Sequence, residues 1–252
     1  MDLAYDGAPF RGFAKQPGQP TVQGELEDAL SRLLGMEAQL TVAGRTDAGV
    51  HALAQVVSVP GVPDSTDLVK LADGLNSLCG PAIAVHGCVA APDDFNARFD
   101  ARSRTYVYAI LCGGVADPWL ARTAWSHPEP LDVGAMGEAA GHLLGRRDFS
   151  SFGRLPAPDA DGTRTLFELS CSRSGSLLRI KARADAFLQQ MVRSLVGTLV
   201  SAGRGRLDPD DVPAVLAATD RAAAGPVAPP HGLCLVAVEY DAGWSRPFDP
   251  FQ

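Results

Sequence analysis

The feature that most constrains the fold of this chain is a repeated order of strand-like and helix-like segments. Judged by the spacing of apolar residues, each half predicts a strand, a helix, two strands, a second helix and a closing strand. The first half places these elements at 3–5, 22–34, 40–42, 53–59, 68–78 and 82–89. The second half places them at 105–111, 133–144, 163–171, 177–184, 187–202 and 233–238. This order is typical of the split βαβ, ferredoxin-like unit.

The repeat predicts an α+β protein in which two ferredoxin-like βαββαβ halves build a mostly antiparallel sheet. We expect residues 1–97 to form the N-terminal half and residues 98–252 the C-terminal half, with a central cleft at the seam. A chain of 252 residues can bury roughly three quarters of its unfolded surface, which is enough for two closely packed halves.

Individual residues predict where the helices begin and end. Thr21 and Thr66 are candidate N-caps, because a threonine hydroxyl can accept a hydrogen bond from an unpaired backbone N–H. Gly35 and Gly203 are candidate stops, since glycine readily adopts the left-handed conformation that ends many helices. A short additional helix is expected over 208–218.

The charge of the chain is unevenly distributed. The net charge is −7, which by itself argues against a nucleic-acid partner. Residues 98–206 nevertheless carry a net charge of +5, while residues 1–97 and 207–252 carry −7 and −5. Arginines outnumber lysines 19 to 3, and guanidinium groups bind phosphate in bidentate fashion and stack on bases. The middle segment is either an RNA-binding surface or a solvated face whose arginines reflect a GC-rich genome.

Several other protein classes are disfavoured by the sequence. The longest apolar stretch, 187–202, is interrupted by Gln189, Gln190 and Arg193, so we expect no membrane span. The five cysteines form no Cys-x-x-Cys pair, and the five histidines lack the spacing of metal ligands. We therefore expect reduced thiols, no metal, no secretion signal and a cytoplasmic location.

A loop rich in functional groups follows the second expected strand, at Gly44-Arg45-Thr46-Asp47-Ala48-Gly49-Val50-His51-Ala52. Its glycines allow a tight backbone that presents Asp47, although an aspartate between glycines is usually only a turn residue. A carboxylate that does chemistry must stay ionised, and a neighbouring arginine favours the ionised form. Arg45 and Arg193 are candidate partners, but an arginine at the edge of an apolar helix face often extends into solvent.

This loop resembles the active-site motif of the tRNA pseudouridine(38–40) synthase family. Further similar segments extend over nearly the whole chain, at 5–12, 21–26, 95–108, 147–152, 187–199 and 224–233. The resemblance implies the pseudouridine synthase fold and an isomerase that converts uridines 38, 39 and 40 of the tRNA anticodon stem-loop to pseudouridine. It also implies a homodimer. No cofactor is expected, because the bond that breaks and the bond that forms lie in one nucleotide.

The resemblance also implies roles for individual residues. Asp47 is the nucleophile, and whether it attacks the ribose or assists glycal formation is left open by the sequence. Tyr106 stacks on the target base. Tyr106 and Tyr108 are two residues apart and share one face of the expected strand, which is also typical of ordinary sheet packing. Arg193 pairs with the aspartate, and Arg45 fills the space that the displaced base leaves. We expect Tyr108 in the core.

Further basic and imidazole side chains lie near these motifs. We expect Arg98, Arg102 and Arg104 to form a phosphate-facing strip, although any one of them is also typical of a solvated basic face. His51 and His231 are expected to support the backbone rather than to take part in the chemistry.

The chain departs from the family at three places. Phe13, Arg146 and Val227 stand where family members commonly have Trp, Lys and Thr. These departures concern loop contacts, whereas the residues with implied chemical roles are all present.

Two functions of other classes are alternatives to the isomerase. A non-catalytic RNA-binding module would explain the charge distribution but leaves Asp47 without a purpose. A glycoside or nucleoside hydrolase needs a second carboxylate at a defined separation, and Asp100 and Asp148 are poor candidates for it. Release of free uracil would distinguish hydrolysis from isomerisation.

Overall fold

The computed structural model describes residues 1–113, 117–157 and 159–241. The chain forms two compact units: unit 1 is Met1–Arg104 with the segment that begins at Cys234, and unit 2 is Thr105–Leu233. Helices and strands are mixed, and most strand pairs are antiparallel, which confirms the expected α+β class. The boundary at Arg104 separates two compact units and does not test where one functional half ends and the next begins. The division into residues 1–97 and 98–252 therefore stays a prediction.

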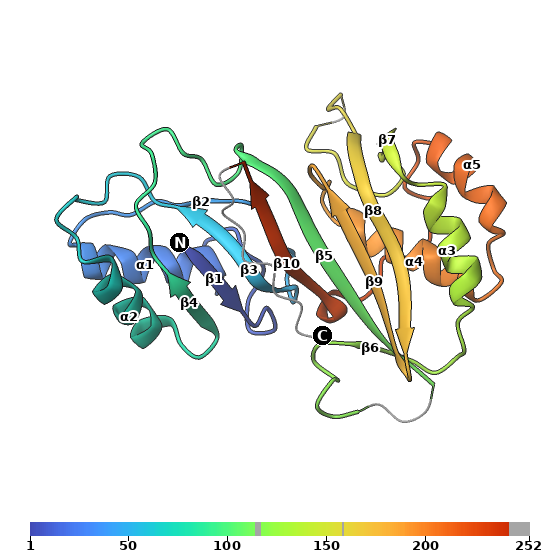
Figure 1. Cartoon of the computed structure of the whole chain (residues 1–252), viewed down its shortest axis with the longest axis horizontal. Helices are drawn as coiled ribbons and strands as arrows, with labels where there is room; N and C mark the ends of the chain where they lie inside the picture. Colours follow the sequence, from blue (N-terminus) through green and yellow to red (C-terminus); the bar gives the residue numbers. More distant parts are fainter. Residues whose placement is uncertain (114–116, 158, 242–252) are drawn as a thin grey trace. The chain divides into compact units, whose positions relative to one another are not determined.

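Unit 1 contains a sheet in the order β4-β1-β3-β10, and β2 pairs with the last residues of β3. Strand β10 runs parallel to the start of β3, whereas β1 is antiparallel to both of its neighbours. Helices α1 and α2 pack against each other, and α2 also contacts β4 (Figure 1). The elements are β1 Asp2–Tyr5, α1 Val22–Leu34, β2 Thr41–Val42, β3 His51–Ser58, α2 Leu68–Cys79, β4 Ile83–Gly87 and β10 Leu233–Tyr240.

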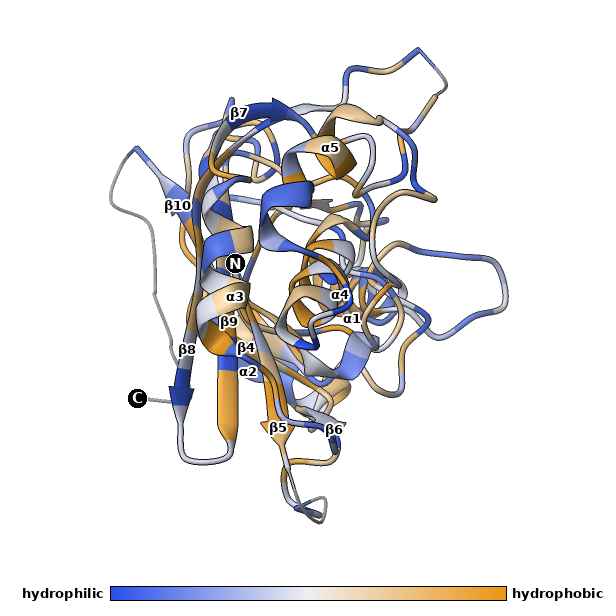
Figure 2. Cartoon of the chain, turned by 90° about the vertical axis from the view of Figure 1, so that its right-hand side faces the viewer, coloured by the Kyte–Doolittle hydropathy of each residue, from blue (hydrophilic) through white to orange (hydrophobic). Residues whose placement is uncertain are grey.

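Unit 2 contains strands in the order β5-β9-β8-β7, and β6 is parallel to β5. Helices α3, α4 and α5 gather on one side of β8 and β9, which Figures 1 and 2 both show. Strand β5 begins in unit 1 and continues into unit 2. The elements are β5 Ala101–Cys112, β6 Trp125–His127, α3 Val133–Gly141, β7 Gly145–Asp148, β8 Thr163–Ser174, β9 Leu177–Ala184, α4 Met191–Gly203 and α5 Val212–Ala217.

The predicted ends of the first helix are confirmed, and the predicted cap of the second is wrong by one residue. The Thr21 hydroxyl accepts a hydrogen bond from the Gly24 N–H, and Gly35 ends α1 in the left-handed conformation. Asp67, rather than Thr66, caps α2, because its carboxylate accepts hydrogen bonds from two backbone N–H groups of the first turn. The Thr66 N–H is instead bonded to the Pro63 carbonyl in the preceding turn.

Helix α4 begins at Met191, four residues later than the apolar pattern predicts. Gln190 has a φ of 64°, and this left-handed residue separates the helix from the preceding segment. Gln189 forms an isolated β-bridge with Arg154, whose N–H donates to the Gln189 carbonyl at 2.9 Å. Residues 187 and 188 therefore lie outside the helix, because the bridge to Arg154 and the left-handed Gln190 interrupt the helical backbone before Met191.

The helix expected over 133–144 also ends early, at Gly141, and two short strands escaped prediction. Strand β7 is Gly-Arg-Arg-Asp, which Figure 2 shows as hydrophilic along its length. Strand β6 has only three residues. Neither strand carries the apolar alternation by which a strand is identified in a sequence.

Segment 225–230 lies directly on the backbone of α4. An added Cβ at Gly197 would lie 1.6 Å from the Pro226 carbonyl oxygen, so only glycine fits. The Gly225 N–H donates to the Thr198 hydroxyl at 2.9 Å, and the Ala228 N–H donates to the Arg193 carbonyl at 3.1 Å. Helix and segment therefore meet backbone to backbone.

Replacing Gly197 by alanine is expected to lower the free energy of unfolding by about 1–3 kcal/mol or more, because the new methyl group overlaps a backbone oxygen. The matched control is Gly137→Ala in α3, where an added Cβ has no atom within 4 Å. That variant should gain about 1 kcal/mol, since alanine is the better helix former. Urea denaturation of both variants measures the difference, and equal stabilities would contradict the close contact.

Candidate active site

Asp47 lies in the loop 44–50 between β2 and β3, which is called the Asp47 loop below. Its side chain is half-buried, and that of Arg45 is exposed. The Asp47 carbonyl accepts a hydrogen bond from the Val50 N–H at 3.1 Å, which closes a tight turn in which Gly49 has a φ of 78°. Only glycine takes up this conformation without strain, which explains the second glycine of the motif. The turn fixes the backbone that carries the candidate nucleophile.

A buried polar network supports the start of the Asp47 loop. Gln55 of β3 is fully buried, and its amide donates to the Gly44 carbonyl at 2.8 Å and to the Tyr5 hydroxyl at 3.2 Å. The Tyr5 hydroxyl lies 2.8 Å from the Thr46 hydroxyl. Because a buried polar group is costly when unpaired, these bonds hold the loop in one arrangement. Sequence reasoning missed Gln55, although a lone amide in an apolar strand was the available signal.

Loop 8–20 packs its backbone against the Asp47 loop. The Phe13 N–H donates to the Thr46 carbonyl at 3.0 Å. Gly12 has a φ of 100°, and an added Cβ there would lie 3.0 Å from the same carbonyl. Phe13 itself is fully buried, and its ring centroid lies 6.0 Å from that of Tyr5. The departure at Phe13 therefore falls on a core position beneath the loop.

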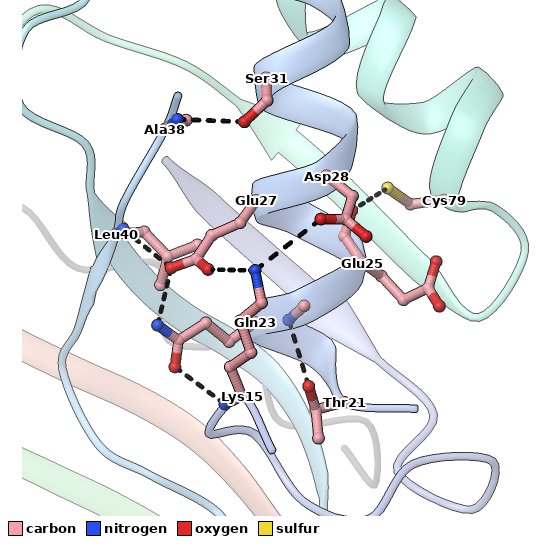
Figure 3. Close-up of polar contacts among 11 residues, drawn as sticks. Lys15, Thr21, Gln23, Glu25, Glu27, Asp28, Ser31, Ala38, Leu40 and Cys79 are labelled. Atoms are coloured by element: carbon pink, nitrogen blue, oxygen red, sulfur yellow. Dashed lines mark hydrogen bonds and ion pairs between the residues drawn. The ribbon is translucent and has the colours of Figure 1, made fainter. Parts of the chain in front are cut away.

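A second polar cluster fastens loop 8–20 to α1 (Figure 3). Glu27 is buried, and its carboxylate accepts hydrogen bonds from Gln23 at 2.7 Å, from Lys15 at 3.2 Å and from the Leu40 N–H at 3.3 Å. The hydrogen bond to Glu27 raises the pKa of Lys15, so the ammonium stays charged at neutral pH. Hydrogen bonds from β3 and from loop 8–20 therefore support the Asp47 loop, and loop 8–20 is in turn hydrogen-bonded to α1.

His51 faces the backbone of the opening segment. Its Nδ1 lies 3.2 Å from the Gly7 nitrogen and 3.2 Å from Oδ1 of Asp6. These contacts agree with the supporting role expected for His51.

The structure contradicts the expected role of Arg104. The side chain is only 7% exposed, and its guanidinium donates to the Ala43 carbonyl at 2.8 and 3.1 Å, to the Ala101 carbonyl at 3.0 Å and to the Arg98 carbonyl at 2.5 Å. A guanidinium that is enclosed by peptide carbonyls cannot face phosphate. Arg104 instead holds the end of β2, immediately before the Asp47 loop, against the start of β5.

The other two members of the expected strip are exposed. The Arg102 guanidinium forms an ion pair with the Asp241 carboxylate, which lowers the pKa of Asp241. The Arg98 guanidinium lies 5.6 Å from the ring centroid of Phe99. The prediction that these three arginines form a continuous phosphate-facing strip is therefore wrong.

Tyr106 and Tyr108 lie on β5 in unit 2. Tyr106 is 7% exposed, and its ring packs edge to face against that of Phe187 with centroids 5.2 Å apart. Tyr108 is fully buried, and its hydroxyl donates to the Pro229 carbonyl at 2.8 Å, which confirms its expected place in the core. Burial raises the pKa of Tyr108 well above its ordinary value, and the nearby charge of Arg193 acts in the opposite direction.

Arg193 lies in the first turn of α4 and is half-buried. Its Nε donates to the Ala228 carbonyl at 2.7 Å, and the Arg193 carbonyl accepts from the Ala228 N–H at 3.1 Å. The guanidinium is therefore anchored on segment 225–230, which disagrees with an arginine that simply extends into solvent.

The four predicted site residues divide between the two units. Asp47 and Arg45 belong to one loop of unit 1, and Tyr106 and Arg193 belong to unit 2. The pairing of Asp47 with Arg193 joins the units and stays a prediction.

Three further findings concern thiols, metals and membranes. All five cysteines are free, and burial raises the pKa of Cys171 and Cys234 to about 12. Within residues 1–113, 117–157 and 159–241, no group of three or more His, Cys, Asp or Glu side chains could hold a metal ion. In the same ranges no helix is both long and apolar enough to cross a membrane.

Replacing Arg104 by alanine is expected to lower the free energy of unfolding by about 2–4 kcal/mol, because three buried carbonyls lose a charged donor. Lysine should not restore stability, since one ammonium cannot reach the positions of a planar guanidinium. Urea denaturation measures both variants. Arg102→Ala is the control and should leave stability unchanged, because its ion pair with Asp241 is exposed. Equal effects at the two positions would contradict the assignment.

Comparisons with known proteins show which family the chain resembles. A family model described as tRNA pseudouridine synthase matches residues 3–100 and 139–241. The chain is 45% identical to tRNA pseudouridine synthase A of Bordetella petrii over 95% of its length and 90% of the relative. It is 46% identical to tRNA pseudouridine synthase A of Frankia casuarinae over 95% of this chain and 88% of the relative. It is 44% identical to tRNA pseudouridine synthase A of Moorella thermoacetica over 95% of this chain and 98% of the relative.

A solved structure of a Cbf5-Nop10-Gar1 complex has a TM-score of 0.34 at 13% identity over 80% of this chain and 45% of that chain, which is too weak to support an inference. The family model and the relatives each cover most of the chain. This chain therefore belongs to the tRNA pseudouridine synthase family and is an isomerase.

Proposed function

We propose that the chain converts uridines 38, 39 and 40 of the tRNA anticodon stem-loop to pseudouridine, with Asp47 as the nucleophile. The observation that carries this proposal is the construction of the Asp47 loop. The Gly44 carbonyl, the Thr46 carbonyl and hydroxyl, and the Asp47 carbonyl are all hydrogen-bonded, while the Asp47 side chain is half-buried. Bonds at residues 44, 46, 47 and 50 hold the backbone on both sides of the Asp47 side chain, and a reactive group in a fixed position is what precise catalysis requires.

The proposed reaction is balanced within one nucleotide. The C1′–N1 bond breaks, a C1′–C5 bond forms, C5 loses its proton and N1 gains one. The product has the same composition as the substrate, so neither an oxidant nor a second substrate is needed. Two routes begin from the carboxylate of Asp47: attack on C1′, which gives an ester and releases uracil within the site, or removal of the C2′ proton, which gives a glycal.

The remaining proposed roles are those that the family resemblance implies, and the surroundings of each side chain are compatible with them. A base in a stem must leave its stack at a cost of a few kcal/mol. Arg45, exposed beside Asp47, fills the vacated space. Tyr106 stacks on the extruded base, and its largely covered ring suits an enclosed site better than an open platform. Arg193, anchored on the Ala228 carbonyl, orients the Asp47 carboxylate.

The fold and assembly are proposed on the same basis. Each half forms a ferredoxin-like unit of the pseudouridine synthase fold, and the two halves enclose a central cleft. Within unit 1, the pairing of β4 with β1, β1 with β3 and β3 with β2 supports this proposal. The chain acts as a homodimer in the cytoplasm, with tRNA as its partner.

The hydrolase is the weaker alternative, because the two candidate second carboxylates belong to local turns. Asp100 accepts a hydrogen bond from the Asn96 N–H at 2.7 Å, and Asp148 accepts one from the Ser150 N–H at 2.9 Å. Such contacts are typical of structural aspartates.

Asp47→Asn is expected to abolish pseudouridine formation while it leaves the Kd for tRNA within about twofold, because the carboxylate acts on the reacting atoms rather than on phosphate. Unmodified tRNA transcript is incubated with the protein, and pseudouridine is mapped by carbodiimide labelling and primer extension. Signal is expected at positions 38, 39 and 40 alone.

Asp100→Asn is the matched carboxylate control and should retain activity. Turnover by Asp47→Asn would refute the nucleophile, and free uracil would identify a hydrolase. Tight binding by the unaltered chain without any product would favour the RNA-binding module.

Arg193→Ala is expected to lower kcat by about 100-fold or more with a smaller effect on KM, because the guanidinium orients the carboxylate during the chemical step. Lysine should not rescue the rate, since it cannot keep the Nε bond to Ala228 while it binds a carboxylate. Single-turnover kinetics measures the step. A change confined to KM would show that Arg193 only binds tRNA.

A further inference from the structure

Strand β8 contains a β-bulge at Phe167. Leu166 pairs with Ala184 and Glu168 pairs with Arg183, so Phe167 is the extra residue. Leu166 and Leu169 are buried on the side of the sheet where α3 contacts β8. The Phe167 side chain is 45% exposed, which places it on the opposite side, away from the helices. Bulges redirect side chains and are frequent near functional sites.

The exposed Phe167 ring has a basic neighbour. The Arg183 guanidinium lies 5.1 Å from its centroid, within the range of a cation–π contact. The guanidinium lies over one face of the ring, so a base would stack on the other face. An aromatic ring with a basic neighbour is a common means of binding unpaired bases, because every base has a π-face and is attached to phosphates.

The same face of β9 carries a row of basic side chains. Arg179, Lys181 and Arg183 alternate with buried residues along the strand, so they share the helix-free side. Lys181 forms an ion pair with Glu168 at 3.0 Å, which offsets one of the charges. The surrounding sequence, 98–206, has a net charge of +5. This face therefore suits a polyanion.

We propose that Phe167 and Arg183 form a stacking platform for an unpaired base of tRNA, and that phosphates next to this base lie along Lys181 and Arg179. The proposal rests on the proposed function in one respect, namely that tRNA is the substrate. The platform belongs to binding rather than to the chemical step. It selects a loop or a flipped-out base, because bases inside a helix present no free π-face.

Unit 1 offers a matched control. Phe99 is 78% exposed, and the Arg98 guanidinium lies 5.6 Å from its ring centroid. The pair resembles the platform, but three carboxylates, Asp93, Asp94 and Asp100, lie within six positions of it in the sequence. An exposed aromatic–arginine pair in an acidic setting should not bind RNA.

Phe167→Ala is expected to weaken tRNA binding about tenfold and to raise KM, with kcat at saturating tRNA within about twofold of the parent. Phe167→Tyr should keep the parent Kd, because the ring is retained, and Phe99→Ala should have no effect. The Kd is measured by filter binding on unmodified tRNA transcript, and thermal unfolding confirms that each variant is folded. A Kd for Phe167→Ala within about twofold of the parent, or an equal loss for Phe99→Ala, would overturn the platform.

Photocrosslinking provides a direct readout. Ultraviolet irradiation of the complex followed by trypsin should attach a nucleotide to the peptide 165–173, which contains Phe167, and not to the peptide 99–102, which contains Phe99. Absence of that adduct would overturn the proposal. A change in oligomeric state of Phe167→Ala would overturn it as well, because the face would then be an interface between copies of the chain. Failure of the proposed function is distinguishable, since the parent protein would then form no pseudouridine.

Discussion

The position of the Asp47 loop depends on one buried guanidinium. Arg104 donates two hydrogen bonds to the Ala43 carbonyl and one each to the Ala101 and Arg98 carbonyls. Ala43 lies between β2 and the loop, so the residue that precedes the loop is fixed to the start of β5. A guanidinium suits this place because its planar donors can reach several carbonyls at once, which an ammonium cannot do. The guanidinium therefore fixes the backbone that leads into the Asp47 loop.

The sequence predicts an element well where local signals agree and no distant partner intervenes. Helix α1 was predicted to the residue, because Thr21, the apolar face and Gly35 all indicate the same limits. Helix α4 has an equally strong apolar pattern, yet its start was wrong. The left-handed Gln190 and the bridge between Arg154 and Gln189 are tertiary features, and neither has a signal in the local pattern.

The same distinction applies to the candidate site. The motif predicts Asp47 and Arg45 as neighbours, because they lie in one short loop. Alternation along β5 assigns Arg102 and Arg104 to one face and so predicts one role for both. Their surroundings differ, however: Arg102 meets the Asp241 carboxylate in solvent, whereas Arg104 is enclosed by three carbonyls from two segments. Strand periodicity specifies a face but not what covers it, so the difference had no signal in the sequence.

Segment 225–230 is best understood as the element that holds the two candidate residues of unit 2 in a fixed relation. Its adjacent carbonyls at Ala228 and Pro229 accept hydrogen bonds from Arg193 and Tyr108 respectively. Tyr108 lies two residues after Tyr106 on β5, so a shift of this dipeptide would move the strand that carries Tyr106 and the arginine together. The close approach of Pro226 to Gly197 holds the start of the segment on α4, and the bond from the Ala228 N–H to the Arg193 carbonyl holds the dipeptide there. The segment therefore contributes to the proposed chemistry without a reactive group of its own, because it couples the orientation of Arg193 to the strand that carries Tyr106.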